Sequence, residues 1–409
     1  MSAGVGPSQS SGAPPVDLLT SSRLKLWRNC PRAHFYRYEL ATVSRGPESA
    51  ASALGTTVHH ALEAWWCTWR DLGGYGALDA ALYAARGDEG AEGSEHGGGA
   101  DVDPYTAALT QALVIAYDAR WSRWAAGVEV LGVEAPFVAP LEHPTRPGLL
   151  ARRWAVAGKM DVLLRLSDGR VAIVDHKITA SDARVGSDWR RKLTLDPQVS
   201  TYFGGAEAMG HPADLALWDV LQRPTIKPLM ATPVEDRQYT QPKSRACKAC
   251  RKSPETAPHA EGDLWCVEGR IVTDSGGRLY SAQRETDETS DEYRERLIAR
   301  LADEGPEAAL AHVEVVRTVE EREAHAWALW HTVREIEESR AAVRACGGDA
   351  RAVTQNAGSC MMYGAPCAYL PVCEGTARID DPTRYRRLPV AHAELPAEMQ
   401  VQTQTTKRP

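Results

Sequence analysis

The sequence predicts a mixed α/β (α+β) protein with a central mixed sheet flanked by helices. Segments with apolar residues at helical spacing alternate with β-rich segments, in the order helix, three strands, helix, strand. A second observation joins two of the strands. Ser167-Asp168-Gly169-Arg170 separates the second strand from the third, and Asp-Gly readily takes the positive φ of a tight hairpin.

Composition limits the class of protein. A chain of 409 residues suggests two to three domains, or one domain with large insertions. Hydrophobic residues make up 43% and charged residues 25%, which is ordinary for a soluble protein, and no run of about 18 apolar residues could span a membrane. The net charge of −7 excludes DNA binding by bulk positive charge, so any DNA contact must be a local patch.

The first half of the chain contains the predicted core. Residues 1–16 are rich in Ser, Gly and Pro and predict a disordered arm. Within the core, 17–221, two short helices meet at Pro31, and further helices are predicted over 55–69 and 105–127, with a flexible Gly/Glu-rich loop at 87–103. The strands follow within 128–177 and 214–221, and residues 197–209 form the helix between the third and fourth strands.

The second half is less regular. Residues 222–290 are polar and predict an inserted lobe. Residues 291–345 show helical periodicity, and they end in a long helix from about 318 to 344, whose start matches a capping box of Thr318 and Glu321. The helical and cysteine-bearing segment continues to 389, and 390–409 is a polar tail.

Two acids and a lysine form the candidate catalytic set. Asp161 lies in the second strand, and Asp175 and Lys177 lie at the end of the third, two apart and therefore on one face. Paired carboxylates suit Mg²⁺ or Mn²⁺, and the lysine would orient or activate a water. A metal that neutralises a phosphate and activates water is what phosphodiester hydrolysis needs. The alternative is an amphipathic strand with solvated ends.

Five short motifs occur in order: SSRLKLWRNCPRAHFYRY, GTTVHHALE, GKMDVLL, AIVDHK and QVSTY. With them the chain resembles the PD-(D/E)XK nuclease superfamily, in particular its RecB-like branch with an iron–sulfur cluster. The resemblance covers most of 21–221 and resumes at 354–373. It implies a restriction-endonuclease-like core and nuclease activity.

The resemblance also assigns roles. It implies that His59, Asp161 and Asp175 are metal ligands, together with the backbone carbonyl of His176. Gln198 and Tyr202 match the family's QxxxY motif, one helical turn apart and facing the active site or DNA. Met160 stands where the superfamily name has proline, and His60 is the alternative to His59. The roles of two further acids are left open. Glu63 is structural or supports the ligands, and Glu134 is a supporting acid or a surface charge.

Nine cysteines without a signal-peptide core indicate a reducing cytosol, where clustered cysteines hold metal. Cys360, Cys367 and Cys373 form a compact triplet that lacks a fourth ligand. By the resemblance, Cys30 is that ligand and the four hold a structural [4Fe–4S] cluster. Zinc in the same site, or reduced buried cysteines, are the alternatives.

A second set lies in the inserted lobe. Cys247 and Cys250 form a CxxC knuckle, and Cys266 with His259 would complete a zinc site. A surface loop in a reducing cell is the competing interpretation.

The expected function is a metal-dependent DNA nuclease in the cytoplasm of a bacterium or phage-infected cell. Exonuclease action on single strands or DNA ends follows from the resemblance alone. No G-x-x-x-x-G-K-[ST] loop is present, so the chain acts alone or with a separate helicase or recombination protein. The alternatives are a non-catalytic, cluster-bearing DNA-binding or recombination-assembly protein, and a structural zinc protein.

Overall fold

The computed structural model describes residues 16–46, 49–87, 102–237, 279–362, 365–393, 395–396 and 399, and only four short strands within 238–278. Its central sheet has six strands, in the order β1 (Asp17–Leu19), β4 (Leu150–Arg165), β5 (Val171–Thr179), β6 (Leu215–Gln222), β11 (Leu310–Val315), with β3 (Glu129–Glu142) paired to β4. The β1–β4 and β5–β6 pairs are parallel and the others antiparallel. The predicted mixed sheet is confirmed.

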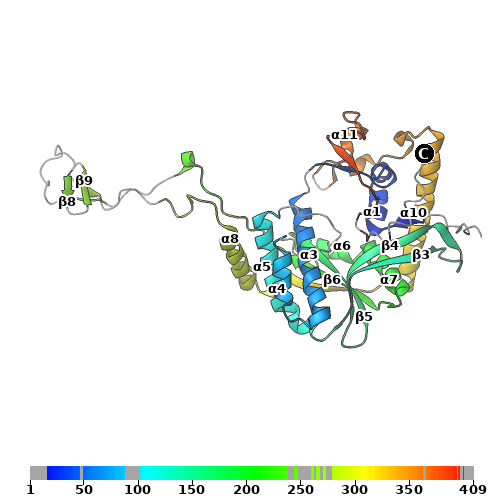
Figure 1. Cartoon of the computed structure of the whole chain (residues 1–409), viewed down its shortest axis with the longest axis horizontal. Coiled ribbons are helices and arrows are strands. Elements are labelled where there is room, and N and C mark those ends of the chain that lie inside the picture. Colours follow the sequence, from blue (N-terminus) through cyan, green and yellow to red (C-terminus); the bar gives the residue numbers. More distant parts are fainter. Residues whose placement is uncertain are drawn as a thin grey trace, which may run out of the picture.

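One face of the sheet is covered by α3 (Ala50–Leu72), α4 (Ala77–Ala84), α5 (Pro104–Ala125) and α8 (Ser290–Glu304) (Figure 1). Trp65, Trp66 and Tyr117 are fully buried in this half of the core and pack edge to face around Trp65. Apolar residues at helical spacing along α3 produce this buried stripe. The predicted helices at 55–69 and 105–127 are therefore present, and the first is longer than expected.

The opposite face is covered by α1 (Ser21–Asn29), α7 (Pro197–Ala208) and α10 (Val319–Ala345) (Figure 1). Thr318 and Glu321 form the predicted capping box of α10. Pro31 begins α2 (Pro31–His34), directly after α1, and a π-helical turn at Phe35–Glu39 continues it, so two short helices meet at the proline as predicted.

Two connections place β4 and β5, the strands that carry Asp161, Asp175 and Lys177. The predicted hairpin joins β4 to β5, with Gly169 at φ 89°. From β5 the chain crosses over through α6 (Asp188–Thr194) and α7 before it returns as β6, parallel to β5. This crossover sets the first turn of α7 beside the end of β5.

Two strands of the sheet were not predicted. The expectation of a helical stretch over 291–345 is wrong at β11, where Leu310, Val313 and Val315 are buried against β6. A short strand with three inward apolar residues gives little periodicity to detect, and the tertiary pairing with β6 decides it. β1 has only three residues and is stabilised by its parallel pairing with β4.

Smaller elements lie outside the main sheet. β2 (Thr42–Ser44) pairs with β12 (Tyr385–Arg387), and α9 (Pro306–Ala309) and α11 (Leu370–Cys373) are single turns. In the predicted lobe, β7 (Ser244–Ala246), β10 (Arg270–Val272), β9 (Leu264–Val267) and β8 (His259–Glu261) form a separate four-stranded sheet. Most of the predicted arm, loop and tail lies outside the described residues. Within the described ranges, none of the helices has both the length and the apolar character of a membrane span.

Candidate active site

The two predicted aspartates lie where β4 and β5 separate. The antiparallel ladder between these strands ends at the pair of Val162 and Val174, and Asp161 and Asp175 come next on their strands. The backbone N–H of His176 donates to Asp161 Oδ2 at 2.8 Å, which holds that carboxylate beside β5. The side chains of Asp161 and Asp175 are 12% and 5% exposed. The structure therefore brings both carboxylates to one end of the hairpin, largely shielded from water.

Lys177 is held in a hydrogen-bonded chain with α7. Its Nζ lies 2.5 Å from Asp175 Oδ2 and donates to Gln198 Oε1 at 3.2 Å. Gln198 Nε2 donates to Asp175 Oδ1 at 2.8 Å and to the Tyr202 hydroxyl at 2.7 Å. Gln198 and Tyr202 lie one turn apart on α7, so they share the face that meets the strands. All four predicted residues thus belong to one network.

His59 approaches the aspartates from α3. Its Nδ1 lies 3.3 Å from Asp161 Oδ2, whereas the neighbouring His60 is exposed. The His59 ring packs edge to face against that of His176, with 5.8 Å between the ring centroids. The structure therefore places His59, and not His60, at the candidate site.

Glu134 completes a possible metal-binding group that the sequence interpretation left open. Among the described residues, His59, Glu134 and Asp161 are the one group of three whose ligand atoms lie within 4.8 Å of one another. Val133 pairs with Val162 and Ala135 with Met160. Glu134 on β3 therefore lies opposite Asp161 on β4. The register between β3 and β4 reveals this neighbour, and the sequence alone does not specify that register.

The shifted pKa values of His59, Asp175 and Lys177 decide how these groups are charged. Burial, and then the nearby His176, lowers the pKa of His59 to about 4, so its imidazole is neutral at pH 7 and has a free lone pair. Burial raises the pKa of Asp175 to about 6, although Lys177 opposes the shift. Burial disfavours the Lys177 ammonium, but Asp175 and Asp161 outweigh it and raise the pKa of Lys177. Lys177 is therefore an ammonium at neutral pH.

His176 points to the opposite side of β5, as strand alternation requires. Its Nδ1 lies 2.9 Å from Asp219 Oδ2, and the Asp219 side chain is fully buried. Burial opposes the Asp219 charge, but hydrogen bonds from His176 and His312 hold the pKa of this carboxyl well below its usual range. The same hydrogen bond to Asp219, against the effect of burial, raises the pKa of His176. This buried pair fixes the segment of β5 between Asp175 and Lys177.

The donor set fits a divalent metal ion. One neutral imidazole and two carboxylates, those of His59, Glu134 and Asp161, lie within 4.8 Å of one another, and Asp175 follows the end of the same β4–β5 ladder as Asp161. Hard oxygen donors with an imidazole suit Mg²⁺ or Mn²⁺, and no thiolate that would favour a softer metal is among them. The His176 carbonyl remains a predicted ligand.

The four cysteines assigned to the iron–sulfur cluster come from two ends of the chain. Cys30 is buried where α1 ends, and Cys367 and Cys373 pack against the same apolar cluster. The backbone N–H of Asn356 donates to Cys30 Sγ at 3.5 Å, and the Cys367 N–H donates to the Cys360 carbonyl at 2.7 Å. The fold therefore brings Cys30 into the region of the predicted triplet.

The predicted zinc site falls partly outside the described residues. Cys247 and Cys250 are not described, although β7 ends at Ala246. His259 on β8 and Cys266 on β9 are paired directly across the two strands. Zinc binding by this lobe remains a prediction.

The chain is similar to the proteins of one known family. A family model of the PD-(D/E)XK nuclease superfamily matches residues 18–374. No curated protein matches significantly. Among solved structures, the crystal structure of SSO0001 is similar at 11% sequence identity and a TM-score of 0.18, over 49% of this chain and 71% of that one, and a likeness this weak carries no argument. Because the family match spans the sheet, both catalytic strands and α7, the chain belongs to the PD-(D/E)XK nuclease superfamily.

Proposed function

We propose that this protein is a metal-dependent DNA exonuclease of the RecB-like branch, with a structural [4Fe–4S] cluster. The observation that supports the catalytic part is the convergence of His59, Asp161, Asp175 and Lys177 from α3, β4 and β5. A protein that kept the fold only to bind DNA would have no need of an intact acid–acid–lysine set.

In this proposal the carboxylates of Glu134, Asp161 and Asp175 and the imidazole of His59 hold Mg²⁺ or Mn²⁺. The metal, when bound, neutralises charge on the scissile phosphate and lowers the pKa of the attacking water. Glu134 and Asp161 are the acids within 4.8 Å of the imidazole, and Asp175 is the neighbour of His176, whose backbone N–H donates to Asp161.

Lys177 supports the attack as a hydrogen-bond donor. Because it is an ammonium, it cannot take the proton of water, so it orients the water oxygen and stabilises the negative charge that develops on the phosphate. The water oxygen bonds to phosphorus and gives up a proton to solvent, the bond from phosphorus to the leaving oxygen breaks, and that oxygen leaves with a proton from solvent. Gln198 hydrogen-bonds to both Lys177 and Asp175 and so fixes the positions of the two side chains relative to each other.

The cluster assignment is supported by the approach of the chain ends. Asn29 accepts hydrogen bonds from Asn356 Nδ2 at 2.8 Å and Ser359 Oγ at 2.7 Å, so the segment before Cys360 is fastened to the end of α1. In a zinc site the four sulfurs would lie ~3.8 Å apart, from Zn–S bonds of ~2.3 Å. Among the described cysteines, no three have sulfur atoms that all lie within 4.8 Å of one another. A cluster bonds each thiolate to its own iron atom, so its sulfurs lie farther apart than those of a zinc site.

The test compares cleavage of end-labelled single-stranded DNA, duplex DNA and closed circular DNA in Mg²⁺ or Mn²⁺. Asp161→Ala and Lys177→Ala should each lower the cleavage rate at least ~10²-fold, the scale of losing a positioned catalytic group. Asp168→Ala, in the exposed hairpin turn, is the matched control and should cleave as the wild type does. Equal rates in all four proteins would show a contaminating nuclease, and rapid cutting of circles would replace exonuclease by endonuclease action.

A further inference from the structure

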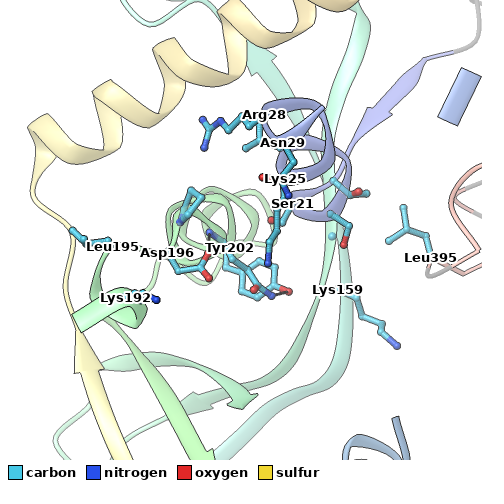
Figure 2. Close-up of a pocket in the computed structure, with 16 residues that line it drawn as sticks. Ser21, Lys25, Arg28, Asn29, Lys159, Lys192, Leu195, Asp196, Tyr202 and Leu395 are labelled. Carbon is cyan, nitrogen blue, oxygen red and sulfur yellow. Dashed lines mark hydrogen bonds between the residues drawn. The ribbon is translucent and has the colours of Figure 1, made fainter. Parts of the chain in front are cut away.

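A cavity of about 560 Å³ lies beside the candidate active site, between α1 and the start of α7 (Figure 2). Gln198 and Tyr202 of α7 and Gly158 of β4 are among the residues that line it. Gln198 donates to Asp175, so the cavity adjoins the catalytic network directly. A molecule that filled it would reach the end of β5.

Cations surround this cavity. Lys25 and Arg28 extend from α1 and Lys192 from α6, and all three are exposed. In Figure 2, Lys25 and Lys192 lie on two sides of Tyr202. A further lysine of the lining, Lys159, pairs with Glu134 and is thereby tied to the metal group.

Within the described part of the chain, none of Lys25, Arg28 and Lys192 lies within 4 Å of an acidic group. Glu335 attracts Arg28 from beyond this distance and accepts the indole N–H of Trp27. By contrast, Arg23, Arg170, Arg296 and Arg340 each form an ion pair with an acid. The acid in the lining, Asp196, uses its carboxylate to accept the Gln198 N–H at 2.9 Å and so caps α7. In a protein with a net charge of −7, this is a local patch of positive charge.

Other features of the lining suit a nucleotide chain. Ser21, in the first turn of α1, has a buried hydroxyl with no hydrogen-bond partner among the described residues. The amino end of a helix also favours an anion. At the rim, Leu195 is 80% exposed, which leaves an apolar surface for a base or sugar.

The size of the cavity favours one strand over a duplex. Its volume falls within the roughly 300–1,000 Å³ of ligand pockets. The major groove of a duplex alone accommodates an entire α-helix, so a double helix is too wide for this space.

We propose that this cavity binds the phosphodiester backbone of a single DNA strand next to the scissile phosphate, with Lys25, Arg28 and Lys192 contacting its phosphates. The inference rests on the proposed nuclease function, because it leads the strand to Asp175 and Lys177. It adds a binding site for the single strand and three binding residues outside the catalytic set.

The test is a triple variant, Lys25→Ala/Arg28→Ala/Lys192→Ala. Its matched control is Arg86→Ala/Arg123→Ala/Lys227→Ala, which removes the same charge from exposed positions elsewhere. Binding of labelled single-stranded DNA is measured in EDTA, so that affinity is read without cleavage. Each lost phosphate contact should reduce the slope of log K against log salt concentration by ~0.7, which is about 2 for the triple variant. Near 0.15 M salt the triple variant should bind ~10- to 100-fold more weakly. Binding of a blunt duplex should weaken less.

The outcomes separate the two proposals. If the triple variant binds single strands as tightly as its control, or loses duplex binding to the same extent, the cavity is not a single-strand site, whether or not the wild type cleaves DNA. If the triple variant loses single-strand binding while the wild type cleaves no DNA, the cavity assignment stands and the nuclease proposal fails. Unchanged thermal unfolding of both variants would show that the losses are not due to misfolding.

Discussion

Two features of Glu134, its backbone conformation and the position of its carboxylate, indicate a functional role. Its backbone has a φ of 48°, a left-handed conformation that costs a non-glycine residue roughly 1–2 kcal/mol. Such strain persists where the surrounding structure imposes it, and it is common at functional sites. Its carboxylate is paired with Lys159 and lies within the group of possible metal ligands. We therefore treat Glu134 as a ligand instead of a surface charge.

Replacing Glu134 by Gln should weaken Mn²⁺ binding by roughly 10- to 100-fold, because the amide removes a charged donor while it keeps the shape of the side chain. Titration calorimetry with Mn²⁺ measures this directly. Glu129→Gln is the control, since Glu129 lies on the same strand and pairs with Arg165 at the surface. Equal affinities for the two variants would remove Glu134 from the metal site.

At the level of elements, one aromatic ring of the sheet packs closely against α7. Phe137 of β3 packs edge to face with Tyr202 at 6.0 Å between ring centroids. A Cβ placed on Gly205 of α7 or on Gly158 of β4 would lie 2.7 Å from this ring. Only glycine fits at either position, and the close approach sets where Gln198 and Tyr202 stand.

Gly205→Ala should therefore lower the free energy of unfolding by about 1–3 kcal/mol through overpacking, and it should slow DNA cleavage by shifting Gln198. The adjacent Gly204 is exposed and a Cβ there meets nothing within 4 Å. Gly204→Ala should raise stability by about 0.4–1 kcal/mol and leave cleavage unchanged, because it only reduces the freedom of the unfolded chain. Denaturant unfolding and the cleavage assay check both variants. Equal effects of the two substitutions would contradict this account of α7 docking.

At the scale of the whole molecule, the two ends of the described chain are fastened together. The Arg32 N–H donates to the Thr354 carbonyl at 3.1 Å, and the Tyr369 hydroxyl donates to the Thr42 carbonyl at 2.7 Å. β2 and β12 add a backbone ladder between these ends. The proposed cluster would close the same junction covalently, and closing so long a loop restricts the unfolded chain strongly.

Anaerobically purified protein should be brown, with iron and a broad absorbance near ~400 nm from thiolate-ligated iron. Cys30→Ser should abolish both and lower the melting temperature, because the link between the ends is lost. Cys346→Ser, an exposed cysteine after α10, is the control and should retain iron and colour. Colourless wild-type protein with stoichiometric zinc would overturn the cluster assignment.

Local signals in the chain predicted much of this architecture. Pro31, the Asp168-Gly169 turn and the capping box of Thr318 each act over a few residues, and the structure has them where they were expected. β11 was missed because a strand of six residues in helix-like surroundings is decided by its partner β6. The positions of Asp161, Asp175 and Lys177 could be predicted together because a tight hairpin links their strands.

The sequence by itself therefore determined the mixed α/β class, the helices and hairpin, and the residue types of the candidate site. Only the tertiary structure decided that Glu134 lies across from Asp161, and that Lys25, Arg28 and Lys192 surround one cavity. The physical reason is the distance along the chain over which each interaction acts. Caps, turns and periodicity are local interactions, whereas strand register and the packing of α1 against α7 depend on contacts between residues far apart in the chain.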